Sequence, residues 1–297
     1  MRIAVAGASG FVGRALVRRL EAEGHEIRRF VRRTVERPDE IAWHPASGEV
    51  EQWDRLEGVA AVVNLAGSNL AAGRWTEARR DEIRRSRIEC TRALVATMAH
   101  MNHHPRTFLC ASAVGYYGDR GEEELTEASC RGDSFLAEVC HAWEEEARIA
   151  EAVGIRAVML RMGIVLGPGG ALARLRPVFR AGLGGRLGDG RQWMSWIALD
   201  DLVAVAQRAL EDERWHGPVN AVAPGAVRNA EFTAALAHAL RRPAVLPVPR
   251  FVLRVFLGKM ADETLLASAR VKPQLLEESG FRFKHARIAD ALRAASL

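Results

Sequence analysis

The first two dozen residues constrain the fold of this chain more than any other segment. The run RIAVA (residues 2–6) is a short apolar stretch typical of a buried parallel strand, and the glycine-rich GASGFVG follows it at once. The next segment, ALVRRLEAEG, repeats apolar residues at helical spacing and stops at Gly24. A strand, a glycine turn and a helix in this order predict the phosphate-binding start of a dinucleotide-binding domain.

Each glycine of this turn has its own expected role. Gly7 permits the tight turn, Gly10 lets backbone N–H groups approach a pyrophosphate, and Gly13 lets the helix pack close to the sheet. Phe11 and Val12 open the helix whose N-terminus faces the phosphates, so they belong to the same candidate site. The alternative is a glycine turn that serves packing alone.

Two arginines follow the second expected strand. The segment EIRRFVRR ends with Arg32 and Arg33, where an NAD-specific site usually carries an acidic residue for the ribose 2′-hydroxyl. A guanidinium pairs with a phosphate through two hydrogen bonds, so arginine favours the 2′-phosphate of NADP. We expect Arg32 to make this contact, with Arg33 beside it. The alternative is a solvated charge cluster before the loop at Pro38.

A further apolar run, VAAVVNLAG, predicts another strand of the same sheet. It ends in Leu65, Ala66 and Gly67, where small residues let a cofactor pass close to the backbone. The 297 residues therefore predict an α/β fold with a Rossmann-type doubly wound parallel sheet over residues 1–167. Residues 168–297 are expected to form mainly a smaller, discontinuous C-terminal substrate or lid domain, from which segments near 193–222 return to the sheet.

Composition narrows the classes of partner. The net charge is +5, but basic and acidic residues interleave and form no aromatic-studded basic stripe, so we expect no nucleic acid. No run approaches the ~20 apolar residues of a membrane span, and we expect a cytoplasmic protein. The four cysteines lack CxxC spacing and are expected to be reduced thiols. A small-molecule substrate is the expected partner, and a homodimer is the assembly that we consider.

Three histidines have spacings that resemble a metal site. His100, His103 and His104 fall at an expected helix end beside Pro105, without a nearby carboxylate. We therefore expect solvated histidines and no metal ion.

Several segments resemble one known family. The pattern of Gly7, Gly10 and Gly13, the NLAG segment and LRMGIVLGPGG are similar to the extended branch of the short-chain dehydrogenase/reductase superfamily. NLAGSNLAAGRW, SRIECTRALV, FLAEVCHAWEEEA, GLGGRLGDGRQWMSWIALDDL and VKPQLLEESGFRF resemble, more narrowly, the epimerase family that includes the SDR39U1-type proteins.

That resemblance implies an NADP-binding Rossmann domain with a small C-terminal domain. It also implies cofactor contacts at six positions, namely Arg32, Leu65, Ala66, Glu82, Arg87 and Val165. Leu65, Ala66 and Val165 lie at expected strand ends, where a doubly wound sheet binds its ligand. Glu82 and Arg87 lie on one expected helix, so a surface ion pair between them is the alternative.

The acid–base pair that is usual in the superfamily is missing. Its enzymes place Tyr-x-x-x-Lys on the helix after the fifth strand, with a serine or threonine at the end of that strand; the lysine lowers the pKa of the tyrosine. Here TFLCAS keeps Ser112, but residues 135–140 hold neither tyrosine nor lysine, and no lysine precedes Lys259. The only tyrosines, Tyr116 and Tyr117, follow Ser112 closely, and these three residues are the catalytic candidates.

Each candidate has a structural alternative. The two tyrosines could pack in the core instead, and Ser112 could satisfy a backbone group at the end of the strand. Glu138 is a general base if it is buried and an ordinary helix carboxylate if it is exposed. Arg161, at the end of the sixth strand, either reaches the cleft or forms a structural ion pair.

Two functions follow from these patterns. The first is an NADP(H)-dependent oxidoreductase or epimerase-like enzyme that acts on a small polar substrate, such as a nucleotide sugar, with atypical acid–base groups. The second is a regulatory protein that binds NADP(H) without catalysis and senses the redox state.

Overall fold

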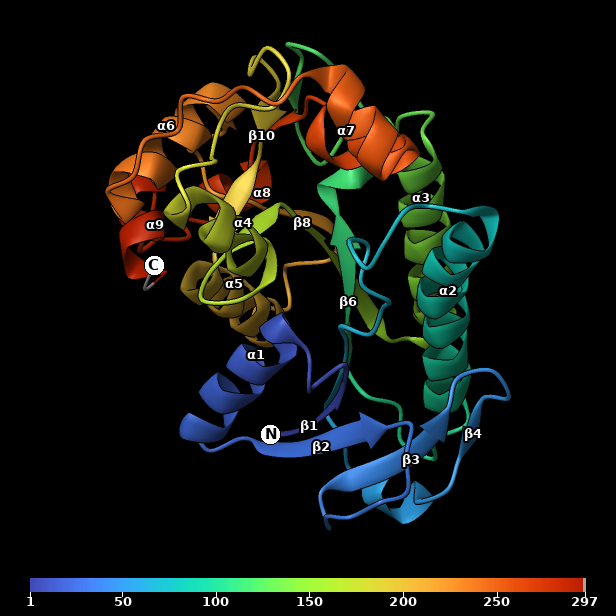
Figure 1. Cartoon of the computed structure of the whole chain (residues 1–297). Helices are drawn as coiled ribbons and strands as arrows, with labels where there is room; N and C mark the ends of the chain where they lie inside the picture. The colour runs from blue at the N-terminus through green and yellow to red at the C-terminus, as the bar shows by residue number, and fades with distance from the viewer. Residues whose placement is uncertain (296–297) are drawn as a thin grey trace.

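The computed structural model describes residues 1–295 and is dominated by an eight-stranded sheet (Figure 1). The order is β12-β8-β6-β5-β1-β2-β3-β4, and each neighbouring pair is parallel except β3 with β4. The strands are β1 (Arg2–Ala6), β2 (Glu26–Val31), β3 (Glu40–His44), β4 (Glu49–Val50), β5 (Ala61–Asn64), β6 (Thr107–Ala113), β8 (Arg156–Met162) and β12 (Gly217–Ala221). The strand order reverses between β1 and β5, which is where a doubly wound sheet binds its ligand, and the predicted fold class is confirmed.

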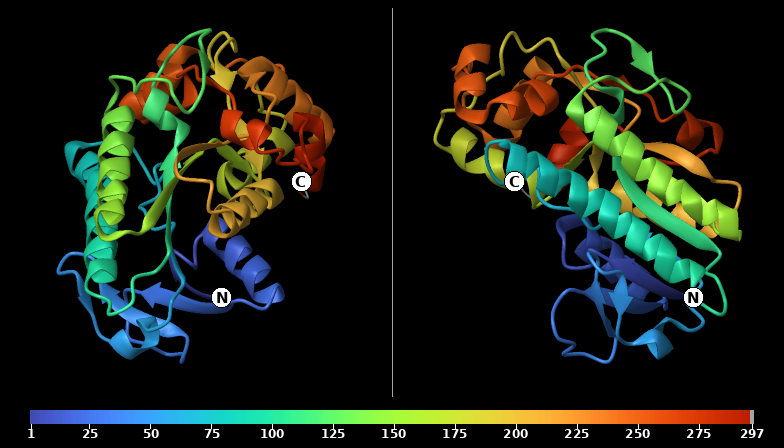
Figure 2. Two further views of the ribbon diagram at one scale, coloured as in Figure 1. Left: turned by 180° about the vertical axis from the view of Figure 1, so that it is seen from behind. Right: turned by 90° about the vertical axis from the view of Figure 1, so that its right-hand side faces the viewer.

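Helices cover both faces of this sheet (Figure 2). Side chains alternate along a strand, so Ile3 and Val5 of β1 pack with one pair of helices while Ala4 and Ala6 face the other pair. The first pair is α1 (Phe11–Ala22) and α5 (Leu199–Glu211), and the second is α2 (Glu77–Ala99) and α3 (Phe135–Arg148). Among the helices of residues 1–295, none combines the length and apolar character needed to cross a bilayer.

A smaller domain stands above the carboxyl ends of the strands (Figure 1). Its own core gathers around Trp196 and Phe232, between α4 (Gly170–Arg180), α6 (Asn229–Leu240) and α9 (Ile288–Ala294). Two small sheets support it, one of β9 (Ile164–Leu166) with β11 (Trp196–Ala198), the other of β10 (Trp193–Met194) with β13 (Val227–Arg228). Between these segments, α5 packs on the main sheet and β12 forms its edge.

The last part of the chain crosses back over the large domain. Helix α7 (Arg250–Leu257) leads into the π-helical turn η4 (Ala261–Leu265), where the Glu263 carboxylate accepts the backbone N–H of Leu136 at 2.8 Å, at the start of α3. Strand β14 (Arg270–Val271) then pairs with β7 (Glu124–Leu125), and α8 (Gln274–Glu278) follows. On the other side, Arg174 of α4 donates to the carbonyl oxygen of Ala71. The crevice at the carboxyl edge is therefore bridged at more than one point.

Candidate cofactor and active site

The glycine turn between β1 and α1 is closed by backbone packing. Gly7 has a φ of 81°, and a Cβ there would lie 2.6 Å from the carbonyl carbon of Leu65. The N–H of Gly10 donates to the Gly7 oxygen at 3.0 Å. A Cβ on Gly13 would lie 2.1 Å from that same oxygen. Glycine at these positions lets α1 and β5 approach the end of β1 this closely.

The N-terminus of α1 is open toward a ligand. Gly10 is its N-cap residue and supplies no side-chain cap, and the first turn carries no acidic side chain. Within residues 1–295, the backbone N–H groups of Phe11, Val12 and Gly13 have no hydrogen-bond acceptor. Three free N–H groups at the positive end of a helix dipole favour an anion such as a pyrophosphate.

The Phe11 ring has a second role that the sequence interpretation missed. It lies against the loop that follows β9, since a Cβ at Gly169 would fall 2.6 Å from the ring. Val165, on β9 just before this loop, is half-buried and lies opposite Ile197 of β11. The glycines of the LGPGG segment were the available signal, because they leave the space that the ring fills.

The two arginines after β2 have different surroundings. Arg33 pairs with the buried Glu40 at 2.7 Å and donates to the Thr34 carbonyl. Arg32 is exposed, and within residues 1–295 it has no hydrogen bond or ion pair. Burial raises the pKa of Cys90 on α2, and the positive charge of Arg32 opposes this effect. Arg32 is thus the arginine that remains free for a phosphate.

The NLAG segment is held by a buried polar chain. The Asn64 side-chain amide donates to the Thr91 hydroxyl at 2.8 Å, and the Trp143 indole N–H donates to the same hydroxyl at 2.8 Å. The Asn64 oxygen accepts the N–H of Ala66 at 3.1 Å, while the N–H of Leu65 continues the pairing with Ala6 at 2.9 Å. Leu65 and Ala66 are therefore fixed, half-buried, beside Gly7.

Glu82 and Arg87 do not pair with each other. Glu82 is exposed and forms an ion pair with Arg79. Arg87 is half-buried and donates to the carbonyl oxygens of Ile83 and Ser68, at 3.1 and 3.2 Å, with no carboxylate partner in the described part of the chain. Burial lowers the pKa of this guanidinium. Arg87 brings a positive charge to the loop after β5, whereas Glu82 faces solvent.

The three catalytic candidates lie next to a buried ion pair of Arg161, which was one of its two expected roles; the partner, Glu144, was not identified from the sequence. Glu144 of α3 and Arg161 of β8 are each 1% exposed, and Arg161 donates to both carboxylate oxygens, at 2.9 and 2.8 Å. The Ser112 hydroxyl donates to the same carboxylate at 2.6 Å. Burial alone lowers the pKa of Arg161, but its hydrogen bonds to Glu144 outweigh this effect and the pKa is raised.

The two tyrosines differ in what their hydroxyls can reach. The Tyr117 hydroxyl is buried, accepts from Arg161 at 2.9 Å and donates to the Asn220 side-chain oxygen at 2.7 Å. Burial raises the pKa of Tyr117 to about 12. Tyr116 is half-buried, with Arg161 stacked 3.5 Å above its ring and His141 edge-on at 6.4 Å. Within residues 1–295 the Tyr116 hydroxyl has no hydrogen-bond partner.

Helical spacing gave a signal for the missed carboxylate. Glu144 lies four residues after the buried Cys140 and three before the buried Ala147, on the face of α3 that packs against the sheet. Glu138 faces the other way and lies 3.7 Å from Arg84 as an exposed pair. The carboxylate that reaches the site is thus outside residues 135–140, where the sequence interpretation looked for it.

All four cysteines are free thiols, and three of them are buried. Burial raises the pKa of Cys110 and of Cys140 to about 12 and also raises that of Cys90. These side chains stay protonated near neutral pH and are unsuited to act as nucleophiles.

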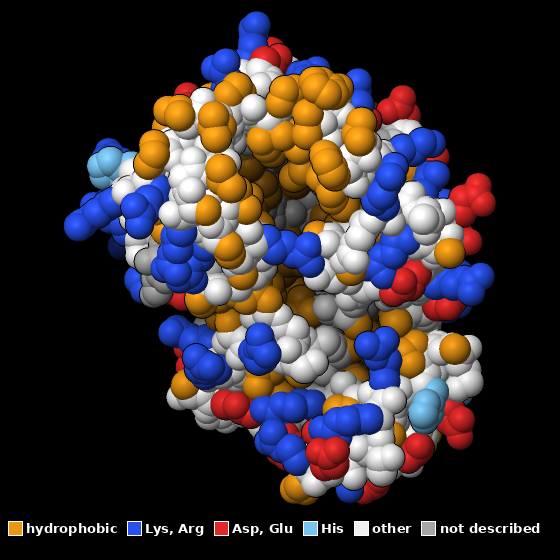
Figure 3. All heavy atoms as spheres, viewed as in Figure 1, with side chains coloured by type: hydrophobic (Ala, Val, Ile, Leu, Met, Phe, Trp, Pro, Cys, Tyr) orange, Lys and Arg blue, Asp and Glu red, His pale blue; other side chains and the backbone are white. Residues whose placement is uncertain are grey.

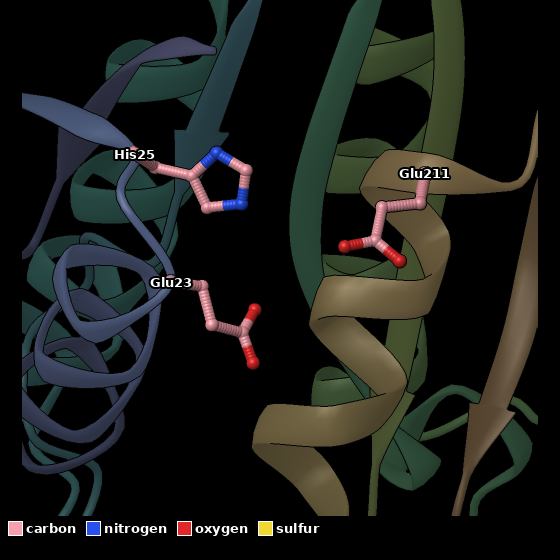
Figure 4. A group of neighbouring side chains, drawn as sticks. All are labelled: Glu23, His25 and Glu211. Carbon is pink, nitrogen blue, oxygen red and sulfur yellow. The ribbon is translucent and has the colours of Figure 1, made fainter.

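A group of three side chains that could hold a metal ion lies at the amino end of β2, away from the carboxyl ends of the strands. Glu23, His25 and Glu211 each offer one ligand atom, and these atoms lie within 4.8 Å of one another (Figure 4). Glu23 already pairs with Arg19 at 2.6 Å, and Glu211 accepts a hydrogen bond from Gln207 at 2.9 Å. Both carboxylates are exposed and engaged by protein groups, so this group stays outside the candidate site.

Comparison with known proteins identifies the family. Residues 3–222 match the model of the NAD dependent epimerase/dehydratase family, and residues 248–295 match a domain of unknown function, DUF1731. The chain belongs to the NAD dependent epimerase/dehydratase family. The DUF1731 match runs from just before α7 through α9, so it includes both the bridge over the crevice and the last helix of the small domain.

The resemblance to SDR39U1-type proteins is confirmed. Human epimerase family protein SDR39U1 is 35% identical over 299 residues, covering 99% of both chains, and an epimerase family protein of Mycobacterium bovis is 44% identical over 295 residues, covering 99% of this chain and 97% of that protein. The crystal structure of human SDR39U1 with NADPH matches with a TM-score of 0.90 at 33% identity, over 100% of this chain and 99% of that one. A nucleoside-diphosphate sugar epimerase structure from Corynebacterium glutamicum matches with a TM-score of 0.82 at 36% identity, over 99% of this chain and 58% of that one.

Proposed function

We propose that the protein binds NADP(H) in the crevice between β1 and β5 and uses it as an oxidoreductase or epimerase on a small molecule. The observation that carries the proposal is the uncapped start of α1, where Phe11, Val12 and Gly13 present free N–H groups beside the Gly7 turn. These groups suit a pyrophosphate. The family match and the NADPH in the human SDR39U1 crystal support the same cofactor.

The choice of the phosphorylated cofactor rests on Arg32. Its neighbour Arg33 is held by Glu40, while Arg32 is exposed and has no partner within residues 1–295. A charge-assisted contact to a phosphate contributes about 1.5–3 kcal/mol, which corresponds to roughly a tenfold to hundredfold preference for NADPH over NADH.

Proton transfer is assigned to Tyr116. NADPH, when bound, supplies a hydride to a carbonyl carbon, and the carbonyl oxygen then needs a proton. Tyr117 and Ser112 have hydroxyls committed to Asn220 and Glu144. The Tyr116 hydroxyl has no such commitment, so in this proposal it gives the proton, and Ser112 and Tyr117 hold Glu144 and Arg161 in place beneath it. The His141 ring lies edge-on beside the Tyr116 ring.

The substrate of this proposal carries an alcohol or a carbonyl group. The name of the C. glutamicum structure makes nucleoside-diphosphate sugars the first class to test. NADPH oxidation with a panel of such sugars and of simple ketones is the activity measurement, and Tyr116→Phe is expected to abolish most of the turnover. Turnover that survives in Tyr116→Phe would reassign the proton donor.

One observation favours the non-catalytic alternative. The region of α3 that should carry the Tyr-x-x-x-Lys pair reads FLAEVC, with Phe135, Leu136, Ala137, Val139 and Cys140 buried in the protein. A redox sensor would bind NADP⁺ and NADPH, turn over nothing in the panel, and bind a partner differently in the two states. Equal partner binding with both cofactors and without cofactor would remove this alternative.

The binding proposal is tested by fluorescence titration. Tryptophan emission is followed as NADPH or NADH is added to wild type, Arg32→Ala and the matched control Arg33→Ala. We expect Arg32→Ala to weaken NADPH at least about tenfold and to leave NADH unchanged, with a smaller effect of Arg33→Ala. If neither cofactor binds the wild type, the proposal fails.

A further inference from the structure

Exposed apolar side chains are concentrated in one stretch of the chain. Ten large hydrophobic residues of the described part are exposed, and seven of them lie between residues 178 and 256. Four are Val178, Leu183, Val245 and Leu246, and the others are on α7. Monomeric proteins seldom gather apolar side chains on one surface unless that surface binds something.

These seven residues form one continuous structure, which we call the apolar rim. The loop after α4 runs beside the loop before α7, because the N–H of Gly188 donates to Val248 at 2.8 Å and the N–H of Val248 donates to Arg186 at 2.9 Å. Gly185 lies so close to the second loop that a Cβ would overlap the Leu246 oxygen, at 1.6 Å. Leu183 and Leu246 therefore lie in neighbouring loops, and α7 begins shortly after the second loop.

The rim borders the crevice of the candidate site. Leu257, at the end of α7, packs on the cluster that contains Trp75 and Phe135, beside the loop after β5 and the start of α3. Figure 3 shows apolar side chains gathered around the upper half of a hollow, below α7 and beside the small domain, with further apolar side chains inside it. A ligand that enters the hollow from this side passes over the rim.

The polar groups on α7 do not compete for such a ligand. Arg250 pairs with Asp189 at 3.3 Å and Arg254 pairs with Asp262 at 2.8 Å. Phe251 and Phe256 are 67% and 70% exposed. The helix thus offers a free apolar face, while its two guanidinium groups are already neutralised.

We propose that the substrate is an amphiphile whose polar head reaches Tyr116 and whose hydrocarbon chain lies on the apolar rim. The inference rests on the proposed function, since it places the head at the site described above. A second copy of the chain fits less well, because apolar side chains border the upper half of a hollow, whereas a two-fold interface needs a self-complementary surface.

The test uses a homologous series of n-alkyl β-D-glucosides, from hexyl to decyl, below their micelle concentrations. Binding to wild type saturated with NADPH is measured by isothermal titration calorimetry. Each added methylene should tighten binding by about two- to fourfold if the chain lies on the rim. A chain-length dependence close to zero would overturn the proposal.

Variants locate the effect. Phe251→Ser and Phe256→Ser alter exposed side chains and should flatten the dependence to less than about 1.5-fold for each methylene. Ile149→Ser is the matched control, since Ile149 is 54% exposed in η3 (Ile149–Val153), between α3 and β8, and should leave the dependence intact. An unchanged dependence in both rim variants would overturn the proposal.

Two other occupants give distinct results. If the rim joins two copies, light scattering shows a dimer that Phe251→Ser dissociates. If it lies on a membrane, phosphatidylglycerol vesicles bind wild type and not Phe251→Ser. Either pattern overturns the proposal. The NADPH titration of the wild type is run first. If NADPH does not bind, the proposed function is overturned instead.

Discussion

The part of the crevice beside β1 and β5 is formed by backbone groups, whereas the part beside β6 and β8 is formed around a buried ion pair. The first region depends on Gly7, Gly13 and the free N–H groups at the start of α1. The second depends on Glu144 and Arg161, which come from different elements and neutralise each other out of water. Backbone geometry is encoded within one short segment, whereas the ion pair exists only once α3 and β8 have packed together. The two regions should therefore respond differently to substitution.

The largest expected effect is the loss of the buried carboxylate. Glu144→Gln leaves Arg161 charged and buried without its countercharge, which should lower the free energy of unfolding by about 3–5 kcal/mol. Urea denaturation followed by circular dichroism measures this. The control is Glu145→Gln, one residue along α3; the side chains of its pair with Arg148 are 50% and 41% exposed, so the pair should contribute less than about 1 kcal/mol. Equal effects of the two variants would show that the buried pair is not what holds this region.

Substitution in the glycine region should weaken NADPH binding as well as stability. Gly13→Ala puts a methyl group 2.1 Å from the Gly7 oxygen, so α1 must shift, at a cost of about 1–3 kcal/mol. The shift moves the free N–H groups, and NADPH affinity should fall at least about tenfold. Gly10→Ala separates stability from binding, because its Cβ would lie 3.2 Å from the same oxygen and needs only a small adjustment of the fold, while it would still hinder the approach of the pyrophosphate. Wild-type NADPH affinity in Gly13→Ala would contradict the assignment of this turn.

The hydroxyls of the two tyrosines should contribute differently to stability. Tyr117→Phe removes a hydroxyl that satisfies Arg161 and Asn220, and should lower the free energy of unfolding by about 1–3 kcal/mol. Tyr116→Phe removes a hydroxyl without a protein partner and should change stability by less than about 0.5 kcal/mol. Thermal and urea unfolding of both variants provide the comparison. A large destabilisation by Tyr116→Phe would mean that its hydroxyl is structural as well.

The smallest expected effect is a change in the pH dependence of stability, caused by Glu127 near the ion pair. Burial raises the pKa of Glu127, whose carboxylate accepts the N–H of Asn220 at 3.0 Å. A carboxyl with a raised pKa in the folded state stabilises the fold below its usual value of 4.5, and this contribution is lost as pH rises through the raised pKa. Glu127→Gln should reduce this loss between pH 4.5 and neutral pH, as measured by urea midpoints. Parallel pH profiles of wild type and variant would exclude Glu127 as the source.

Sequence reasoning succeeded where local patterns determine the structure. The strand, glycine turn and helix at residues 2–22 are specified within one segment, and so is the position of Arg32 just after β2. Glu144 was missed because the acidic run of α3 suggests a solvated face, and only the packing of α3 against β8 reveals its partner. The loss of the Tyr-x-x-x-Lys pattern was visible in the sequence, but the free hydroxyl of Tyr116 depends on contacts that no spacing encodes.

The bridge over the crevice, which includes α7, η4 and β14, is joined to the rest of the protein by contacts between distant parts of the chain. The backbone N–H of Ser268 donates to Asp119 across 149 positions, and β14 beside it pairs with β7. Contacts of such separation close late in folding, since a long loop must first lose its freedom. The sheet can therefore assemble before the crevice has a cover, and a segment that follows the sheet strands along the chain completes it. The same order in reverse makes this cover the first region expected to exchange its amide hydrogens with solvent.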